Sequence, residues 1–201
     1  MFQALQVIPQ SILIWAEYLN FIEAVEVEEG NIREAFEEAV KVMGKHYDGW
    51  KIWNMYINFE RGGGNMMAVC MLYNRVIRIP NRDLEQQVAE ISSIIEQRQN
   101  EETRAMRIVR EVFDETKEEK AKIECYEDRV TKGSGDLAAW QEYIGWMEAE
   151  GGNPAIMDVL MERAKMDCGN DEEFWLINYM KWWKGRGMVS EKVNKTRKLY
   201  R

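Results

Sequence analysis

A three-residue spacing between aromatic residues recurs along the chain and restricts its fold more than any other feature. Trp53, Tyr56 and Phe59 form the pattern Trp-x-x-Tyr-x-x-Phe, and at 3.6 residues per turn their rings share one face of an α-helix. The three glycines at 62–64 predict the end of that helix, because glycine adopts the left-handed conformation at little steric cost. A second apolar run with helical spacing continues to Pro80, so this stretch predicts two antiparallel helices.

The aromatic pattern returns at intervals that are typical of helical repeats. From Trp15 to Trp53 is 38 residues (53 − 15), and from Trp140 to Trp175 is 35 residues (175 − 140). Such periods indicate stacked two-helix repeats. We therefore predict an all-α fold, an antiparallel helical-hairpin α-solenoid that forms a single array over 1–201. Clear repeats are expected near 11–44, 48–80, 136–168 and 171–201, with a divergent, charge-rich repeat at 81–133.

Each repeat is expected to bury its aromatic residues against the neighbouring helices, because a repeat array has no single central core. The alternative is that tryptophans stack on the bases of single-stranded nucleic acid, but their fixed place in each repeat favours a structural role. The expected anchors are Trp15, Tyr18, Phe21, Trp53, Tyr56, Phe59, Tyr73, Pro80, Trp140, Tyr143, Trp146, Trp175 and Tyr179.

Several helix starts can be predicted from capping residues. Ser11, Asp48 and Asp136 each precede an aromatic run and are expected to be N-caps. Asn31, with Glu34 three residues later, predicts a capping box at the start of a helix that runs to about Gly44. Asn153 is followed by a proline at the first helical position and gives the clearest helix start.

Composition argues against several classes of protein. The net charge is −8 and the pI is about 5.0, which disfavours nucleic-acid binding over the whole surface. The three cysteines, Cys70, Cys125 and Cys168, form no Cys-x-x-Cys pair, so neither a disulfide framework nor a zinc site is indicated. No apolar segment reaches the length of a transmembrane helix. We expect a soluble, intracellular protein.

Residues that could support catalysis are almost absent. His46 is the single histidine, so neither a histidine metal cluster nor a Ser-His-Asp arrangement can be assembled. The glycines at 62–64 follow a predicted helix and lack the strand and the Lys-Ser/Thr pair of a phosphate-binding loop. We therefore predict a protein that is not an enzyme and has no cofactor and no metal, in which His46 is an ordinary loop residue.

The C-terminal segment differs in charge from the rest of the chain. From Lys181 to Arg201 there are eight basic residues against one acid, Glu191. This asymmetry indicates contact with RNA phosphates or with an acidic protein, and a solvated helix face is the simpler alternative. The candidate contact residues are Lys181, Trp183, Lys184, Arg186, Lys192, Lys195, Arg197, Lys198 and Arg201. Arg75, Arg78 and Arg82 form a smaller basic group.

Three stretches, 31–53, 52–80 and 138–183, carry parts of one hairpin pattern: Trp-x-x-Tyr-x-x-Phe/Trp, then Gly-Asn, then a second helix. This order resembles the HAT (half-a-TPR) repeat of RNA-processing factors, and especially that of a U1 small nuclear ribonucleoprotein component. The resemblance implies a nuclear, non-catalytic splicing scaffold that supports 5′ splice-site recognition through other splicing-particle proteins. It also implies a possible homodimer or paralogue heterodimer through C-terminal repeats, with RNA contact secondary and no membrane.

Other interpretations of the same residues remain open. The HAT factors of U4/U6 recycling and of mRNA 3′-end cleavage share the repeat pattern. A direct RNA-binding module would use the basic segment 181–201, with Trp183 stacking on a base. An enzyme is the remaining alternative, and it would need a catalytic site that the sequence does not reveal.

Overall fold

The computed structural model describes residues 11–98, 104–133 and 136–169. In this part of the chain all regular structure is α-helical, as predicted. The helices are α2 (Ile12–Val25), α3 (Glu29–Met43), α4 (Trp50–Gly62), α5 (Met66–Val76), α6 (Leu84–Arg98), α7 (Arg104–Lys132), α8 (Leu137–Ala149) and α9 (Pro154–Asp167). Consecutive pairs of these helices, from α2–α3 to α8–α9, each lie within one of the four repeat ranges expected between 11 and 168. The repeat expected at 171–201 lies outside the described residues.

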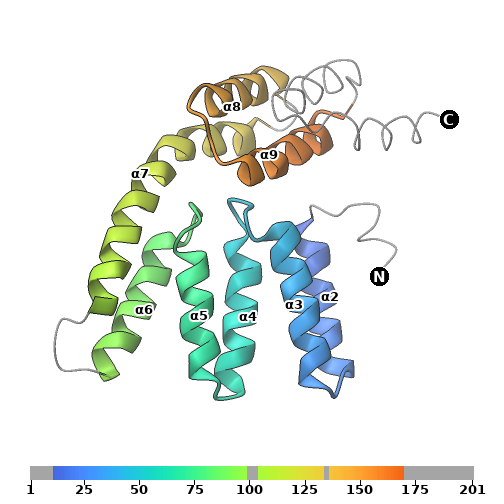
Figure 1. Ribbon diagram of the computed structural model, residues 1–201. Coiled ribbons are helices and arrows are strands. Elements are labelled where there is room, and N and C mark those ends of the chain that lie inside the picture. The colour runs from blue at the N-terminus through green and yellow to red at the C-terminus, as the bar shows by residue number, and fades with distance from the viewer. Residues whose placement is uncertain (1–10, 99–103, 134–135, 170–201) are drawn as a thin grey trace, which may run out of the picture.

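The helices are arranged in two groups joined by α7. Each helix from α2 to α6 packs against the next, and together they form a row (Figure 1). Helix α7 pairs with α6 and continues past the upper end of α6, and α8 and α9 lie above the upper ends of the row's helices (Figure 1). The α8–α9 hairpin therefore changes direction instead of extending the row. This change of direction was not expected from a single regular array.

Most of the predicted helix starts are confirmed. The Ser11 hydroxyl accepts from the Ile14 amide at 3.4 Å, and the Asp136 carboxylate accepts from two amides at the start of α8. Asn153 caps α9, with proline at the first position. Two predictions are wrong. Helix α3 starts at Glu29, so Asn31 lies within its first turn. Asp48 does not cap α4, because its carboxylate instead pairs with Arg82.

The hairpin turns rely on glycine at two positions. Gly64 has φ of 73° and Gly151 has φ of 65°, both in the left-handed region, where a side chain costs about 1–2 kcal/mol. Each lies just after the first helix of a hairpin. The glycines at 62–64 therefore end α4, as predicted, and those at 151–152 end α8.

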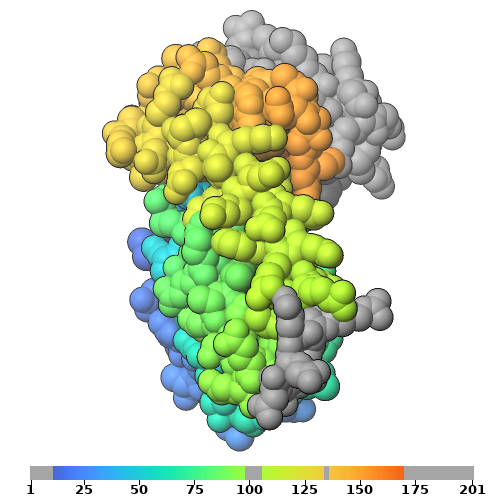
Figure 2. All heavy atoms as spheres, turned by 90° about the vertical axis from the view of Figure 1, so that its left-hand side faces the viewer, coloured from blue at the N-terminus to red at the C-terminus, as the bar shows by residue number. Residues whose placement is uncertain are grey.

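The two groups of helices have separate hydrophobic cores. The first core fills the row α2–α6 and includes Val109 and Val112 from the beginning of α7. The second core lies among α8, α9 and the end of α7. Helix α7 contributes Ile123 and Val130 to it. One continuous helix of 29 residues thus contributes to both cores. Figure 2 shows α7 along the surface of the molecule, running from the row to the α8–α9 hairpin.

Candidate interaction scaffold

The aromatic anchors of the second hairpin pack against the helix before it. Trp53 is 2% exposed, and its indole N–H donates to the Gly44 carbonyl at 3.0 Å. The ring of Tyr56 stacks on Phe36 of α3 with centroids 4.8 Å apart. Phe59 is half-buried and contacts the same Phe36 at 5.5 Å. The three-residue spacing thus presents three rings to the neighbouring hairpin.

The α8 copy of the pattern makes a similar stack. The Trp140 indole N–H donates to the Asp167 carboxylate of α9 at 2.9 Å. Tyr143 and Trp146 both stack on Tyr126 of α7, each with centroids 5.1 Å apart. Trp140 and Tyr143 are buried, whereas Trp146 is half-buried. The repeated pattern therefore joins α8 to both of its neighbours.

The first copy departs from the expected anchoring. Trp15 is buried and Tyr18 is half-buried, but Phe21 is 49% exposed, so its prediction as a buried anchor is wrong. The third ring of the α4 pattern, Phe59, packs on Phe36 of the preceding hairpin. Helix α2 is the first helix of the described part, so Phe21 has no preceding hairpin there to pack on. Helix α2 instead buries Leu19 next to Trp15. Tyr73 and Pro80, at the end of the second repeat, are both buried, and Trp175 and Tyr179 lie outside the described residues.

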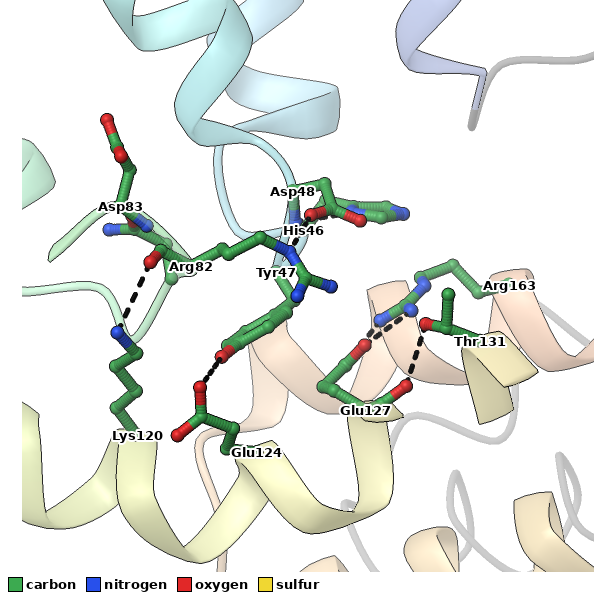
Figure 3. A network of polar contacts seen from close by, with 11 residues as sticks. His46, Tyr47, Asp48, Arg82, Asp83, Lys120, Glu124, Glu127, Thr131 and Arg163 are labelled. Carbon is green, nitrogen blue, oxygen red and sulfur yellow. Dashed lines mark hydrogen bonds and ion pairs between the residues drawn. The ribbon is translucent and has the colours of Figure 1, made fainter. Parts of the chain in front are cut away.

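A loop residue of the row completes the second core. Tyr47 lies between α3 and α4 and is 2% exposed, yet it belongs to the core of α8 and α9. Its hydroxyl donates to Glu124 of α7 at 3.3 Å (Figure 3). Burial and the Glu124 charge both raise the pKa of Tyr47, so the hydroxyl keeps its proton. The Tyr47 side chain thus connects the row to the second core.

Charged residues surround the Tyr47 ring. The Arg82 guanidinium lies over the ring at 5.1 Å and donates to Asp48 at 2.7 Å (Figure 3). Burial alone would raise the pKa of Asp48, but the contact with Arg82 lowers it overall. The Lys120 ammonium, on α7, donates to the Arg82 carbonyl at 3.2 Å. Two loops of the row are therefore tied to α7 by polar contacts.

A buried ion pair holds α9 on α7. Both terminal nitrogens of Arg163 contact the two carboxylate oxygens of Glu127 at 2.7 Å (Figure 3). The side chains are only 13% and 3% exposed. The Tyr143 hydroxyl also donates to Glu127, at 3.0 Å. Burial disfavours the charge on Arg163, but Glu127 outweighs this effect and raises its pKa.

The junction of the two groups is tightly packed. A cavity of only about 10 Å³ lies between Tyr47, Glu127, Tyr143 and Arg163. His46, next to it, is 9% exposed, and its Nδ1 accepts from the Asp48 amide at 2.9 Å. Burial, followed by the Arg163 charge, lowers the pKa of His46 to about 3. The histidine expected to be an ordinary loop residue is therefore a buried, neutral part of this junction.

Of the basic residues singled out in the sequence, the structure describes only the smaller group. Every one of them from Lys181 to Arg201 lies outside the described residues. Within the smaller basic group, Arg75 pairs with Glu37 at 2.6 Å and Arg82 pairs with Asp48. Arg78, in the turn after α5, is exposed and donates back to Asn74 of that helix. The three arginines therefore do not form one free basic patch.

The described residues contain no set of three His, Cys, Asp or Glu side chains that could hold a metal ion. Over the same residues, no helix is both long and apolar enough to cross a membrane. What the geometry does provide, over the described residues, is an arrangement of helical hairpins packed against one another.

Comparison with known proteins agrees with this arrangement. Residues 1–93 match the family model described as PRP39 N-terminal HAT repeat. Pre-mRNA-processing factor 39 of Homo sapiens is 25% identical over 245 residues, covering 90% of this chain and 36% of that protein. Its Saccharomyces cerevisiae counterpart is 23% identical over 196 residues, covering 92% and 30%.

A relative with another name matches less of the chain. Spliceosome associated factor 3, U4/U6 recycling protein, of Pongo abelii is 26% identical over 171 residues, covering 81% of this chain and 17% of that protein. The chain spans roughly a third of the length of the pre-mRNA-processing factor 39 relatives. The comparisons thus show that this chain resembles the HAT-repeat RNA-processing family and, within it, the pre-mRNA-processing factor 39 proteins.

Proposed function

We propose that this chain is a non-catalytic HAT-repeat scaffold in pre-mRNA splicing, which acts in the U1 small nuclear ribonucleoprotein to support 5′ splice-site recognition. The observation that carries the proposal is the packed junction around Tyr47 and the Glu127–Arg163 pair. It holds two groups of repeats in one geometry, as a scaffold requires when it must place partners relative to one another. The similarity to pre-mRNA-processing factor 39 supports the choice of pathway.

The partners follow from the same reasoning. The scaffold contacts other splicing-particle proteins through helix faces, and it works in the nucleus. Self-association or pairing with a paralogue through C-terminal repeats, and direct RNA contact by residues 181–201, are further parts of the proposal. The alternative pathway is U4/U6 recycling, favoured by the similarity to spliceosome associated factor 3.

Capture from nuclear extract tests the proposal. The tagged chain is incubated with extract, and the captured U1, U4 and U6 RNAs are quantified together with the proteins. We expect U1 RNA and its proteins to be enriched over U4 and U6. Enrichment of U4 and U6 would favour the recycling alternative, and recovery of none of these components would refute a splicing role.

A matched variant separates specific from nonspecific capture. Phe36 is fully buried and its ring packs on Tyr56 and Phe59, so Phe36→Ser removes the centre of the first core at a cost of several kcal/mol. Capture that depends on the folded row is lost in this variant. Components that both proteins retain equally are background.

A further inference from the structure

A groove lies between α3 and α5, beside the loop that follows α3. It encloses about 690 Å³ and is lined by Glu37, Glu38, Val40, Lys41, Gly44, Lys45, Trp53, Arg75 and Ile79. Pockets that bind small molecules typically enclose about 300–1,000 Å³. The groove is therefore large enough to receive side chains of another molecule, unlike the small cavity at the junction.

The floor and the walls of the groove differ in chemistry. Val40 and Ile79 supply apolar groups to the lining, and the buried Trp53 indole lies beneath Arg75. The Arg75 guanidinium lies over that indole at 4.9 Å and contacts both carboxylate oxygens of Glu37 at 2.6 and 2.9 Å. Arg75 is thus held in place at one wall, and its contact lowers the pKa of Glu37.

The unpaired charge on the groove is mainly basic. Glu37 and Arg75 neutralise each other, which leaves Lys41 and Lys45 against Glu38. Within the described part of the chain neither lysine has a carboxylate at ion-pair distance. The whole chain carries a net charge of −8, so this excess of positive charge is local. It favours an acidic occupant.

We propose that the α3–α5 groove binds a short acidic peptide segment of a protein partner, with an apolar side chain against Ile79 and Val40 and carboxylates on Lys41 and Lys45. This inference names the class of partner that the scaffold binds, and it rests on the proposed scaffold function. Lys45 also lines the cavity beside Tyr47, so the groove adjoins the junction of the two groups. A partner bound there touches the point that fixes their arrangement.

Fluorescence anisotropy with the purified full chain tests the groove without any splicing particle. The probe is a fluorescein-labelled synthetic peptide in which Asp and Glu alternate with Leu and Phe. Two companion peptides replace either the acids by Asn and Gln or the apolar residues by Ser. We expect binding of the first peptide alone, weakening as salt is raised.

Charge variants locate the site. Lys41→Glu with Lys45→Glu is expected to weaken binding about tenfold or more, because it reverses the charge that attracts the peptide. Glu38→Lys is expected to tighten binding several-fold, a gain that misfolding cannot produce. The control, Lys117→Glu with Lys165→Glu, makes the same change in net charge on α7 and α9, at residues that do not line the groove, and leaves affinity unchanged.

Specific results would overturn the groove site or change its occupant. Equal weakening by the control and groove variants would refute the site, as would the absence of peptide binding. Tight binding of a fluorescein-labelled oligouridine through Lys41 and Lys45, indifferent to the apolar residues of the peptide, would replace the proposed occupant by RNA. If the peptide binds but no splicing component is captured from extract, the groove stands and the proposed pathway fails.

Discussion

The buried pair of Glu127 and Arg163 gives the sharpest test of how the junction is held. Arg163→Met keeps most of the length of the side chain and its contact with the Trp140 ring, over which the guanidinium lies at 5.4 Å. It leaves the Glu127 carboxylate, which is 3% exposed, with the Tyr143 hydroxyl as its remaining side-chain donor. A buried charge that loses its partner costs about 3–5 kcal/mol.

This cost can be measured and compared with an exposed pair. For a protein of this size, a loss of 1 kcal/mol lowers Tm by roughly 2–4 °C, so we expect a drop of about 6–20 °C for Arg163→Met in calorimetry. The control is Arg129→Met at the Arg129–Glu142 pair, which is 2.6 Å long but 51% and 59% exposed. Its expected cost is about 1 kcal/mol or less.

A second substitution separates charge from packing. Adding Glu127→Gln to Arg163→Met removes the stranded charge but keeps an oxygen to accept from Tyr143, so most of the lost stability should return. If Arg163→Met costs no more than Arg129→Met, the buried pair does not hold α9 on α7. If Glu127→Gln brings no recovery, the loss comes from packing and the electrostatic reasoning is wrong.

Three further perturbations test other features. Because the pKa of His46 is about 3 in the fold and about 6.5 when unfolded, the unfolded state binds more protons between these values, so stability should fall as pH falls through this range. His46→Asn, whose side-chain oxygen can still accept from the Asp48 amide, should reduce that dependence in urea titrations. Tyr47→Ala should cost about 3–5 kcal/mol of stability and raise hydrogen exchange in α9. Tyr47→Phe loses only one hydrogen bond and should cost about 1 kcal/mol. Equal losses of stability in the two variants would contradict a packing role for the ring. Gly64→Ala should cost about 1–2 kcal/mol in thermal melts because φ is 73°, while Gly62→Ala, with open space at its Cβ position, should be neutral or slightly stabilising.

The features that the sequence predicts well depend on residues close together in the chain. The spacing of Trp53, Tyr56 and Phe59 predicts one helical face, and Asn153 before a proline predicts a helix start. These relations are set within one or two turns of helix. Asp48 shows the limit even here, because a competing partner, Arg82, takes the carboxylate from its expected capping role.

The junction depends on contacts that no local pattern contains. Tyr47 meets Glu124, 77 residues later, and Arg163 meets Glu127 across 36 residues. In the sequence, Glu127 is one of many acids in a charge-rich stretch, and Tyr47 lies outside the aromatic repeat pattern. The absence of Gly and Pro from 104–132 is typical of a long helix, but it does not show that this helix joins two cores. The groove likewise combines residues from three helices and could not be seen in any one of them.

The length of α7 has a mechanical consequence. At 1.5 Å per residue, its 29 residues span about 43 Å, with one end embedded in each core. It therefore acts as a lever arm: a tilt of about 5° at the α6 end would carry the other end through about 4 Å, more than the length of a hydrogen bond. A tilt of α7 relative to the row would therefore displace α8 and α9, and the buried Tyr47 side chain resists that displacement.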